Sequence, residues 1–363
     1  MRILKSNFTS TLVVSLIILF LVCVGIYHSS CQITSEGIVL LNPEEQSPKI
    51  VDFSFDEEKI IVNFTKKIKI LDSFVAEVNL ENNSFLDFSN TNDKISVDIE
   101  NTSNENKIQF VVNGKTEIGK KYGLYCLCED FYGNSISFTI PFYGYNKNIP
   151  KIFISEISDY YSSKDGSVEY VELYAATSGN LFGLELITAN DKKVFPLPCI
   201  DVNKGEYIVV HLRTVDKINS ITEYETNLNL SKAKDSVNDR RDIWIDSEES
   251  ALSPSADIVI LNNHQKSAFL DCVMYSKQEY ALENNSWKNE NLLEYSKKCI
   301  EQKVWNTEGL PSDSVYSMDR KSINYISRKN ISTLNSEESI KNDSSVWIGT
   351  TKTNRTPGYE NKW

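Results

Sequence analysis

Short runs of alternating apolar and polar residues fill the chain from residue 49 to residue 145. Seven of them are separated by turn residues: KIVDFSF (49–55), KIIVNFT (59–65), SFVAEVNL (73–80), KISVDIE (94–100), KIQFVVN (107–113), KYGLYCLCED (121–130) and NSISFTIPFYG (134–144). Within these runs apolar side chains recur at every second position, as at Val62 and Phe64. This period is typical of a strand with one face on a core, so the pattern predicts seven half-buried β-strands.

A second set of apolar runs follows the linker GYNKNIP (144–150). It consists of KIFISEIS (151–158), SVEYVELYAA (167–176), LFGLELITAN (181–190), IVVH (208–211) and ADIVILNNHQKSAFLDCVMYS (256–276). Because Pro150 prevents the preceding strand from continuing unbroken, we expect two folding units. The predicted fold class is all-β, with two tandem immunoglobulin-like β-sandwiches over residues 49–145 and 151–363.

Two stretches interrupt the second strand set. Residues 212–255 are long and charged, and we expect them to form a loop. Residues 277–304 contain apolar positions three or four apart, as at Leu292, Tyr295 and Cys299. That spacing predicts a short helical insertion with one buried stripe.

The first 31 residues have the order of a secretion signal. Arg2 and Lys5 supply positive charge, and the apolar run TLVVSLIILFLVCVGIY (11–27) precedes small residues. An uncleaved anchor helix is the alternative, since the run is nearly long enough to span a bilayer. Both interpretations predict that the rest of the chain is exported. Residues 32–48 contain two prolines and little periodicity, and we expect them to form a tether.

The end of this segment points to lipidation. Ser29, Ser30 and Cys31 resemble a lipobox, in which a signal peptidase cuts before a cysteine that then receives lipid. His28 stands where that motif usually has an aliphatic residue. The resemblance implies a bacterial lipoprotein with a covalent lipid at Cys31, anchored in a membrane on the periplasmic or cell-surface side. The alternative is an ordinary cysteine beside an anchor helix.

The end of the first strand set carries a short motif. Gly119, Tyr122, Asp130 and the pair Gly133-Asn134 resemble the last hairpin of bacterial immunoglobulin-like domains of the SbsA type. Both residues of the pair tolerate positive φ, as a tight turn requires. The resemblance implies an SbsA-type domain over residues 49–145.

Several motifs run through the second strand set. They are Ile154, Glu156 and Ile157, then EYVEL (169–173), LFGL (181–184), KGEY (204–207), the paired strands at 256–276, and Trp347 with TPGYEN (356–361). Together they resemble the lamin-tail domain, an immunoglobulin-like sandwich found in nuclear lamins and in exported bacterial proteins. Lys204, Asn263 and Gln265 depart from the usual Pro, Asp and Gly. The resemblance implies a lamin-tail domain over residues 151–363 with insertions at 212–255 and 277–304. An SbsA-like domain and a lamin-tail domain behind a lipobox resemble spirochaetal surface lipoproteins.

The charge balance argues against nucleic acid as a partner. The chain has 38 Lys plus Arg against 50 Asp plus Glu, a net charge of −12. A nucleic-acid binder needs a basic face to neutralise phosphates, and the sequence contains no Lys/Arg cluster with interleaved aromatic residues.

Five cysteines lie in the exported part: Cys126, Cys128, Cys199, Cys272 and Cys299. An odd number leaves at least one thiol free unless chains pair. Cys126 and Cys128 stand two apart on one predicted strand, where they are poorly placed to bond each other. We expect them to be small buried apolar residues.

Familiar enzyme motifs are absent from the sequence, including G-x-S-x-G, H-E-x-x-H, the P-loop and G-x-G-x-x-G. The exported part contains only His211 and His264, for which we expect structural or solvated roles. A histidine-based nucleophile triad is therefore unsupported.

Carboxylates are the remaining candidates for chemistry. Glu156, Glu169 and Glu172 fall on neighbouring predicted strands, and paired carboxylates can serve a glycosidase. We expect them instead on solvated strand faces. A calcium site formed by Asp159, Asp165 and Glu169 is a second hypothesis, because these residues flank one loop.

Tryptophans gather in and beside the insertions and the tail. Exposed Trp on loops suits the recognition of proteins or sugars. We expect packing for Trp287, Trp305 and Trp347, with Trp347 packed back onto the second sandwich, and we keep Trp244 as a candidate binding residue.

These features predict a non-catalytic exported envelope lipoprotein that binds a protein or glycan partner or serves a structural role. The covalent group expected is the lipid at Cys31, with calcium as a second hypothesis. The alternative is an exported hydrolase, or an accessory module of one, with its site in the insertions.

Overall fold

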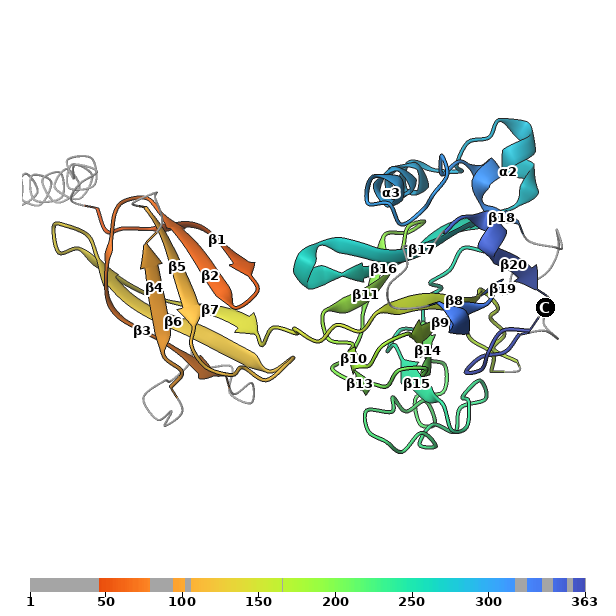
Figure 1. The fold of residues 1–363 in the computed structure, drawn as a ribbon, viewed down its shortest axis with the longest axis horizontal. Helices are drawn as coiled ribbons and strands as arrows, with labels where there is room; N and C mark the ends of the chain where they lie inside the picture. Colours follow the sequence, from red (N-terminus) through yellow and green to blue (C-terminus); the bar gives the residue numbers. More distant parts are fainter. Residues whose placement is uncertain are drawn as a thin grey trace, which may run out of the picture. The chain divides into compact units, whose positions relative to one another are not determined.

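A computed structural model describes residues 46–78, 94–101, 106–164, 166–316, 325–334, 342–350 and 355–362. The chain divides into two compact units. The first comprises residues up to 115 together with 121–142, and the second comprises 116–120 together with 143–363. Both are built from β-sheets, as the sequence predicts (Figure 1).

The described residues of the first unit form a sandwich of seven strands. They are β1 (Ile50–Asp56), β2 (Lys59–Phe64), β3 (Lys69–Glu77), β4 (Val97–Asn101), β5 (Lys107–Val112), β6 (Lys121–Glu129) and β7 (Ser135–Tyr143). One sheet has the order β1-β2-β5-β4 and the other the order β3-β6-β7. The alternating apolar positions of β2, β5 and β6 meet in one core, which includes Val62, Phe110 and Leu124. Cys126 and Cys128 are free, buried thiols in this core, as predicted.

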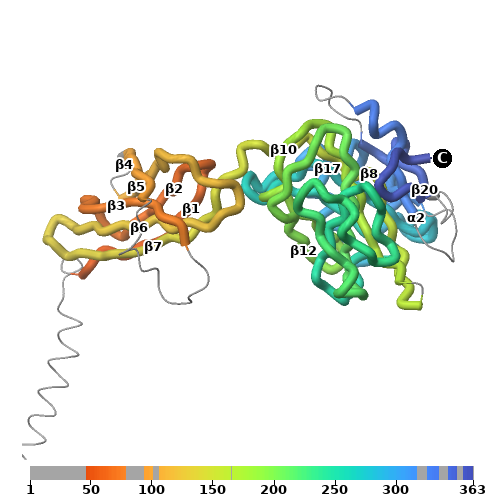
Figure 2. The backbone as a smooth tube through the Cα atoms, turned by 90° about the horizontal axis from the view of Figure 1, so that it is seen from below, coloured from red at the N-terminus to blue at the C-terminus, as the bar shows by residue number. Residues whose placement is uncertain are grey.

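The second unit is a larger sandwich. Its strands are β8 (Ile152–Ser158), β9 (Tyr170–Ala175), β10 (Gly179–Asn180), β11 (Leu184–Thr188), β12 (Lys193–Pro196), β13 (Asp201–Val202), β14 (Tyr207–His211), β15 (Arg241–Trp244), β16 (Ala256–Asn263), β17 (Ala268–Ser276), β18 (Val315–Tyr316), β19 (Tyr325–Arg328) and β20 (Trp347–Thr350). A six-stranded sheet has the order β15-β14-β9-β8-β19-β20, and a five-stranded sheet has the order β12-β11-β16-β17-β18. Strands far apart in sequence, such as β8 and β19, lie side by side (Figure 1), and Figure 2 shows β8 and β20 of the same sheet from a second direction.

The core of this unit lies between its two sheets. Alternate residues of β8, β9 and β14 point inward and are aliphatic, among them Ile154, Leu173 and Val210, and they meet Ile258 and Ile260 of β16. Trp347 belongs to the same cluster and is 2% exposed, which confirms that it packs onto this sandwich. Burying a large aromatic ring in this way stabilises a fold by roughly 2–3 kcal/mol.

The helical insertion forms as predicted. It contains α2 (Gln278–Glu283) and α3 (Glu290–Glu301), and α3 packs on β16 and β17. Asn289 caps α3 by accepting a hydrogen bond from the backbone of Leu292. Leu292 and Cys299 form the buried stripe. Within the described residues, no helix has both the length and the apolar character that a membrane span requires.

The charged stretch at 212–255 is more than a loop, and that expectation is wrong. Residues 241–244 form β15, which runs parallel to β14 and extends the six-stranded sheet. The strand escapes prediction because it is four residues long and lies within a polar segment. Figure 1 shows that β15 and α3 lie against different sheets, on opposite sides of the second unit.

Candidate functional site

Two glutamates on neighbouring strands form the centre of the candidate site. Glu156 of β8 and Glu172 of β9 are register partners, beside a bulge in β8. Their neighbours Ile154, Ile157 and Leu173 lie in the core, so the two carboxylates stand on the outer face of the sheet. Both side chains are nevertheless 0% exposed, which corrects the expectation of solvated strand faces. We call Glu156 and Glu172 the carboxylate pair.

The chain's own C-terminal segment covers this pair. Residues Thr356–Tyr359, here called the C-terminal turn, close with a hydrogen bond from Tyr359 N to Thr356 O of 2.9 Å. Pro357 and Gly358 occupy the central positions, and Gly358 has φ of +81°. This is the pattern of a type II turn, in which Pro presets the second residue and Gly accepts the positive φ of the third.

The turn presents two backbone N–H groups to the carboxylate pair. Thr356 N donates to Glu156 Oε2 at 3.2 Å, and Gly358 N donates to Glu172 Oε2 at 2.5 Å. Pro357 lies between them and has no N–H group to satisfy. The contact therefore uses every backbone donor of the three residues.

Two other side chains also donate hydrogen bonds to Glu156. Ser327 Oγ donates to its Oε2 at 2.9 Å, and the hydroxyl of Tyr170 donates to its Oε1. Burial raises the pKa of Glu156 despite these hydrogen bonds. Burial raises the pKa of Glu172 well above its usual range, and the neighbouring charge of Glu156 adds to the shift. Both effects favour a protonated pair.

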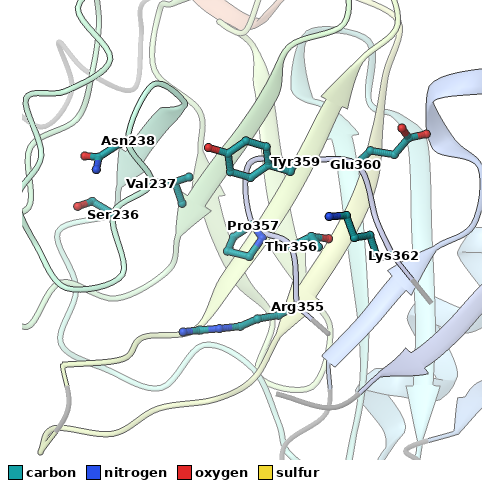
Figure 3. Close-up of a pocket in the computed structure, with 9 residues that line it drawn as sticks. All are labelled: Ser236, Val237, Asn238, Arg355, Thr356, Pro357, Tyr359, Glu360 and Lys362. Carbon is teal, nitrogen blue, oxygen red and sulfur yellow. The ribbon is translucent and has the colours of Figure 1, made fainter. Parts of the chain in front are cut away.

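A hollow of about 640 Å³ opens beside the turn (Figure 3). It is lined on one side by Ser236, Val237 and Asn238, and on the other by the chain end from Arg355 to Lys362. Figure 3 shows Tyr359 and Arg355 on the chain-end side, facing the loop that carries Ser236 and Asn238. The lining combines apolar and aromatic surface with cationic, acidic and amide groups.

A second buried polar cluster lies on the same sheet. His211 Nε2 lies 2.8 Å from Asp242 Oδ1, and the ring of Trp244 stacks on the imidazole with centroids 3.7 Å apart. Asp242 also accepts from Val237 N, which ties the loop beside the hollow to β15. His211 is buried, and the structural role expected for it stays a prediction. Trp244 is 9% exposed, and its role in binding stays a prediction.

The calcium hypothesis concerns the loop after β8. Glu169 is buried, and its two oxygens accept from Ser250 Oγ at 2.8 Å and Ala251 N at 3.0 Å. Arg213 Nε approaches the same carboxylate at 3.6 Å. Asp159 is half-buried, and Asp165 lies outside the described residues. Among the described residues no group of three or more His, Cys, Asp or Glu is arranged to hold a metal ion, and the three-residue site stays a prediction.

A buried ion pair lies between the core and the outer face. Arg328 Nη1 contacts Asp271 Oδ2 at 2.6 Å, and the guanidinium carbon lies 4.8 Å from the Trp347 ring centre. Asn342 Nδ2 donates to the other Asp271 oxygen at 3.0 Å, and Trp347 Nε1 donates to Asn342 Oδ1 at 2.9 Å. This network joins β17, β19 and β20 and has the character of a structural element.

Sequence reasoning found the glutamates but missed what covers them. The spacing of Glu156 and Glu172 identifies strands, whereas nothing local links them to a turn 186–200 residues later. The available signal was Thr-Pro-Gly itself, since Pro-Gly at the centre of four residues predicts a type II turn with outward N–H groups. Cys31, the predicted lipidation site, lies outside the described residues.

Comparisons with solved structures give low scores. The N-terminal part of the bacterial S-layer protein SbsC aligns at 15% identity over 63% of this chain and 43% of that chain, with a TM-score of 0.23. A structure of domains 1–6 of surface layer protein SbsC aligns at 12% identity over 60% and 39%, with a TM-score of 0.22. The alignments span less than half of the S-layer chains, and TM-scores this low do not establish a shared fold.

No curated protein matches the chain. A family model described as "TP_1001_2nd: protein second domain" matches residues 150–349, which lie wholly within the second unit. The match covers more than half of the 363 residues, so the protein belongs to the TP_1001_2nd second-domain family.

Proposed function

We propose that this protein is a non-catalytic, exported envelope lipoprotein whose second unit serves a binding role. In this proposal residues 1–31 are a signal peptide that ends at a lipidated Cys31, and residues 32–48 are a tether. Residues 49–145 are an SbsA-type domain, and residues 151–363 are a lamin-tail domain. The order of charged, apolar and small residues before Cys31 supports the anchor and export.

One observation carries the non-catalytic assignment. The two glutamates with raised pKa values are the residues best suited to acid–base chemistry. Both are 0% exposed and hydrogen-bonded to the backbone of the C-terminal turn. A catalytic acid needs its substrate within hydrogen-bond reach, and here the protein's own chain occupies that position. The arrangement supports recognition of a polypeptide segment rather than turnover of a substrate.

The alternative is an exported hydrolase or an accessory module with a site in the insertions. That function would be favoured by insertions that meet around a shared cavity. The two insertions touch where Lys288 Nζ donates to Ser253 Oγ, but β15 of the first and α3 of the second lie against different sheets. The hollow beside the C-terminal turn receives residues from the first insertion and the chain end only.

Metabolic labelling tests the anchor. Cells that express the full chain are labelled with a palmitate analogue and fractionated. Label should be lost in Cys31→Ser, and the protein should leave the membrane fraction if the signal is cleaved. Cys23→Ser is the matched control, since this residue lies inside the apolar run and should keep the label. Unchanged labelling of Cys31→Ser would contradict the lipoprotein proposal.

A further inference from the structure

The C-terminal segment contacts the sandwich in the manner of a bound ligand. The described residues 355–362 form no strand, and the contacts that hold them are hydrogen bonds, ion pairs and ring contacts. Asn361 Nδ2 donates to Ser155 O at 3.1 Å and to Arg328 O at 3.0 Å. Terminal segments held in this way can separate from a domain without breaking a sheet.

Arg240 and Val237 contact the opposite side of the turn. Arg240 Nε donates to Gly358 O at 2.6 Å, and its guanidinium carbon lies 4.4 Å from the centre of the Tyr359 ring. A Cβ atom on Gly358 would lie 2.7 Å from Arg240 Cγ and 2.9 Å from Val237 Cγ1. The site therefore discriminates against any residue other than glycine by steric exclusion as well as by φ.

We propose that the carboxylate pair, Ser155, Arg240 and Val237 form a peptide-binding site that accepts a Thr-Pro-Gly turn as an exchangeable ligand. The C-terminal turn occupies the site in cis and competes with the same turn from another chain. The hollow of about 640 Å³ gives room for the residues that flank the incoming turn. The turn comes from a second copy of this protein or from another envelope protein. This inference rests on the proposed binding role of the second unit.

Peptide binding to the full chain in detergent tests the inference. The probe is a fluorescent peptide with the sequence of residues 355–363, RTPGYENKW. Gly358→Val should expel the cis turn by its clash with Arg240 and Val237, and a chain that ends at residue 354 lacks the turn. Both should bind the probe saturably, and wild type should bind at least about tenfold more weakly because its site is occupied.

Three controls test which groups of the peptide and of the site are needed for binding. The same peptide with valine in place of glycine should not bind. Adding Glu172→Leu to Gly358→Val should abolish binding, because it removes the acceptor for Gly358 N. Adding Glu294→Leu on α3 should leave binding unchanged, since Glu294 contacts only Lys192 and Lys298 among the described residues.

The results show which protein supplies the incoming turn and whether the inference holds. Capture of wild-type chain by immobilised Gly358→Val would identify a second copy as the source. Probe binding without capture would assign the turn to another protein. Absence of saturable probe binding by both open variants, or loss of cooperative unfolding in both, would overturn the inference and make the turn a permanent part of the fold. Labelling at Cys31 is unaffected by either result, so the anchor is judged separately.

Discussion

Both units are built from strands predicted by alternating residues, but the two units differ in how far the polar positions of these strands are buried. In the first unit β2 and β5 alternate strictly between buried and half-buried positions. In the second unit β8 and β9 are buried along their whole length. The difference arises because the C-terminal segment and residues 212–255 cover the outer face of the six-stranded sheet. Alternation in sequence thus identifies a strand but does not tell whether its polar face meets water.

The largest expected effect is the loss of stability when a buried ion pair of the second unit is broken. Arg328 and Asp271 are 1% and 3% exposed. Arg328→Ala leaves a buried carboxylate without its partner, which should lower the free energy of unfolding by about 3–5 kcal/mol. Denaturant unfolding followed by tryptophan fluorescence reports this unit, because all five tryptophans, from Trp244 to Trp363, lie within it.

A solvent-exposed ion pair of the same unit is the control. Lys193 Nζ contacts Glu249 Oε2 at 2.8 Å, and the Glu249 side chain is 78% exposed. Lys193→Ala should cost at most about 1 kcal/mol, as exposed pairs usually do. Equal losses in the two variants would remove the distinction between the interior and the surface of this unit.

Features that depend on residues close in sequence can be predicted from the sequence, whereas features that depend on residues far apart in sequence cannot. Strands such as β2, β6 and β9 are predictable because period two is a local property, and α3 is predictable from its three-to-four spacing. β15 is missed because its pairing with β14 depends on residues about 33 positions away rather than on its own pattern, Arg241 opposing Ile208. The burial of Glu156 depends on Thr356, 200 residues later, so no local pattern signals it.

The second prediction concerns pH. Burial raises the pKa of Asp257 from 3.8 to about 7. A carboxyl group with a raised folded pKa contributes stability below its unfolded pKa, and that contribution is lost as pH rises through the folded value. Between pH 5 and pH 8, Asp257 should therefore cost the second unit about 2–3 kcal/mol, at roughly 1.4 kcal/mol per pKa unit.

The measurement compares wild type with Asp257→Asn at both pH values. The amide that replaces the carboxyl group does not ionise, so the difference in unfolding free energy between the variants should shift by about 2–3 kcal/mol from pH 5 to pH 8. Glu156, Glu172 and Glu223 also have raised pKa values and are present in both proteins, so their contribution cancels. A constant difference would mean that Asp257 ionises as freely in the folded state as in the unfolded one.

A smaller effect is expected when one hydrogen bond of the interior network is removed. Trp347→Phe keeps most of the apolar area but loses the donor to Asn342 Oδ1. The buried amide oxygen then lacks that partner, which should cost about 1–2 kcal/mol. Trp287→Phe is a matched variant, because its Nε1 donates to a backbone oxygen, Gly309 O, at 2.9 Å. Wild-type stability for Trp347→Phe would show that Asn342 finds another donor.

The smallest expected effect is a loss of stability of the first unit in acid. Asp130 of the first unit accepts from Asn134 N and Tyr132 N, both at 2.9 Å, and from Lys66 Nζ at 2.9 Å. Desolvation opposes the shift, but the hydrogen bonds from Asn134, Lys66 and Tyr132 lower the pKa of Asp130 below its usual value of 3.8.

A group with a lowered pKa contributes stability above its unfolded value and loses it as pH falls through the folded value. Hydrogen exchange of residues 107–143 should therefore show the first unit losing protection as pH falls below about 4, with a smaller loss in Asp130→Asn. In the same pH range the second unit keeps the contribution of Asp257, whose pKa is shifted in the opposite direction. Identical acid profiles for wild type and Asp130→Asn would contradict this reasoning, because the hydrogen-bonded carboxylate would then contribute no stability that acid removes.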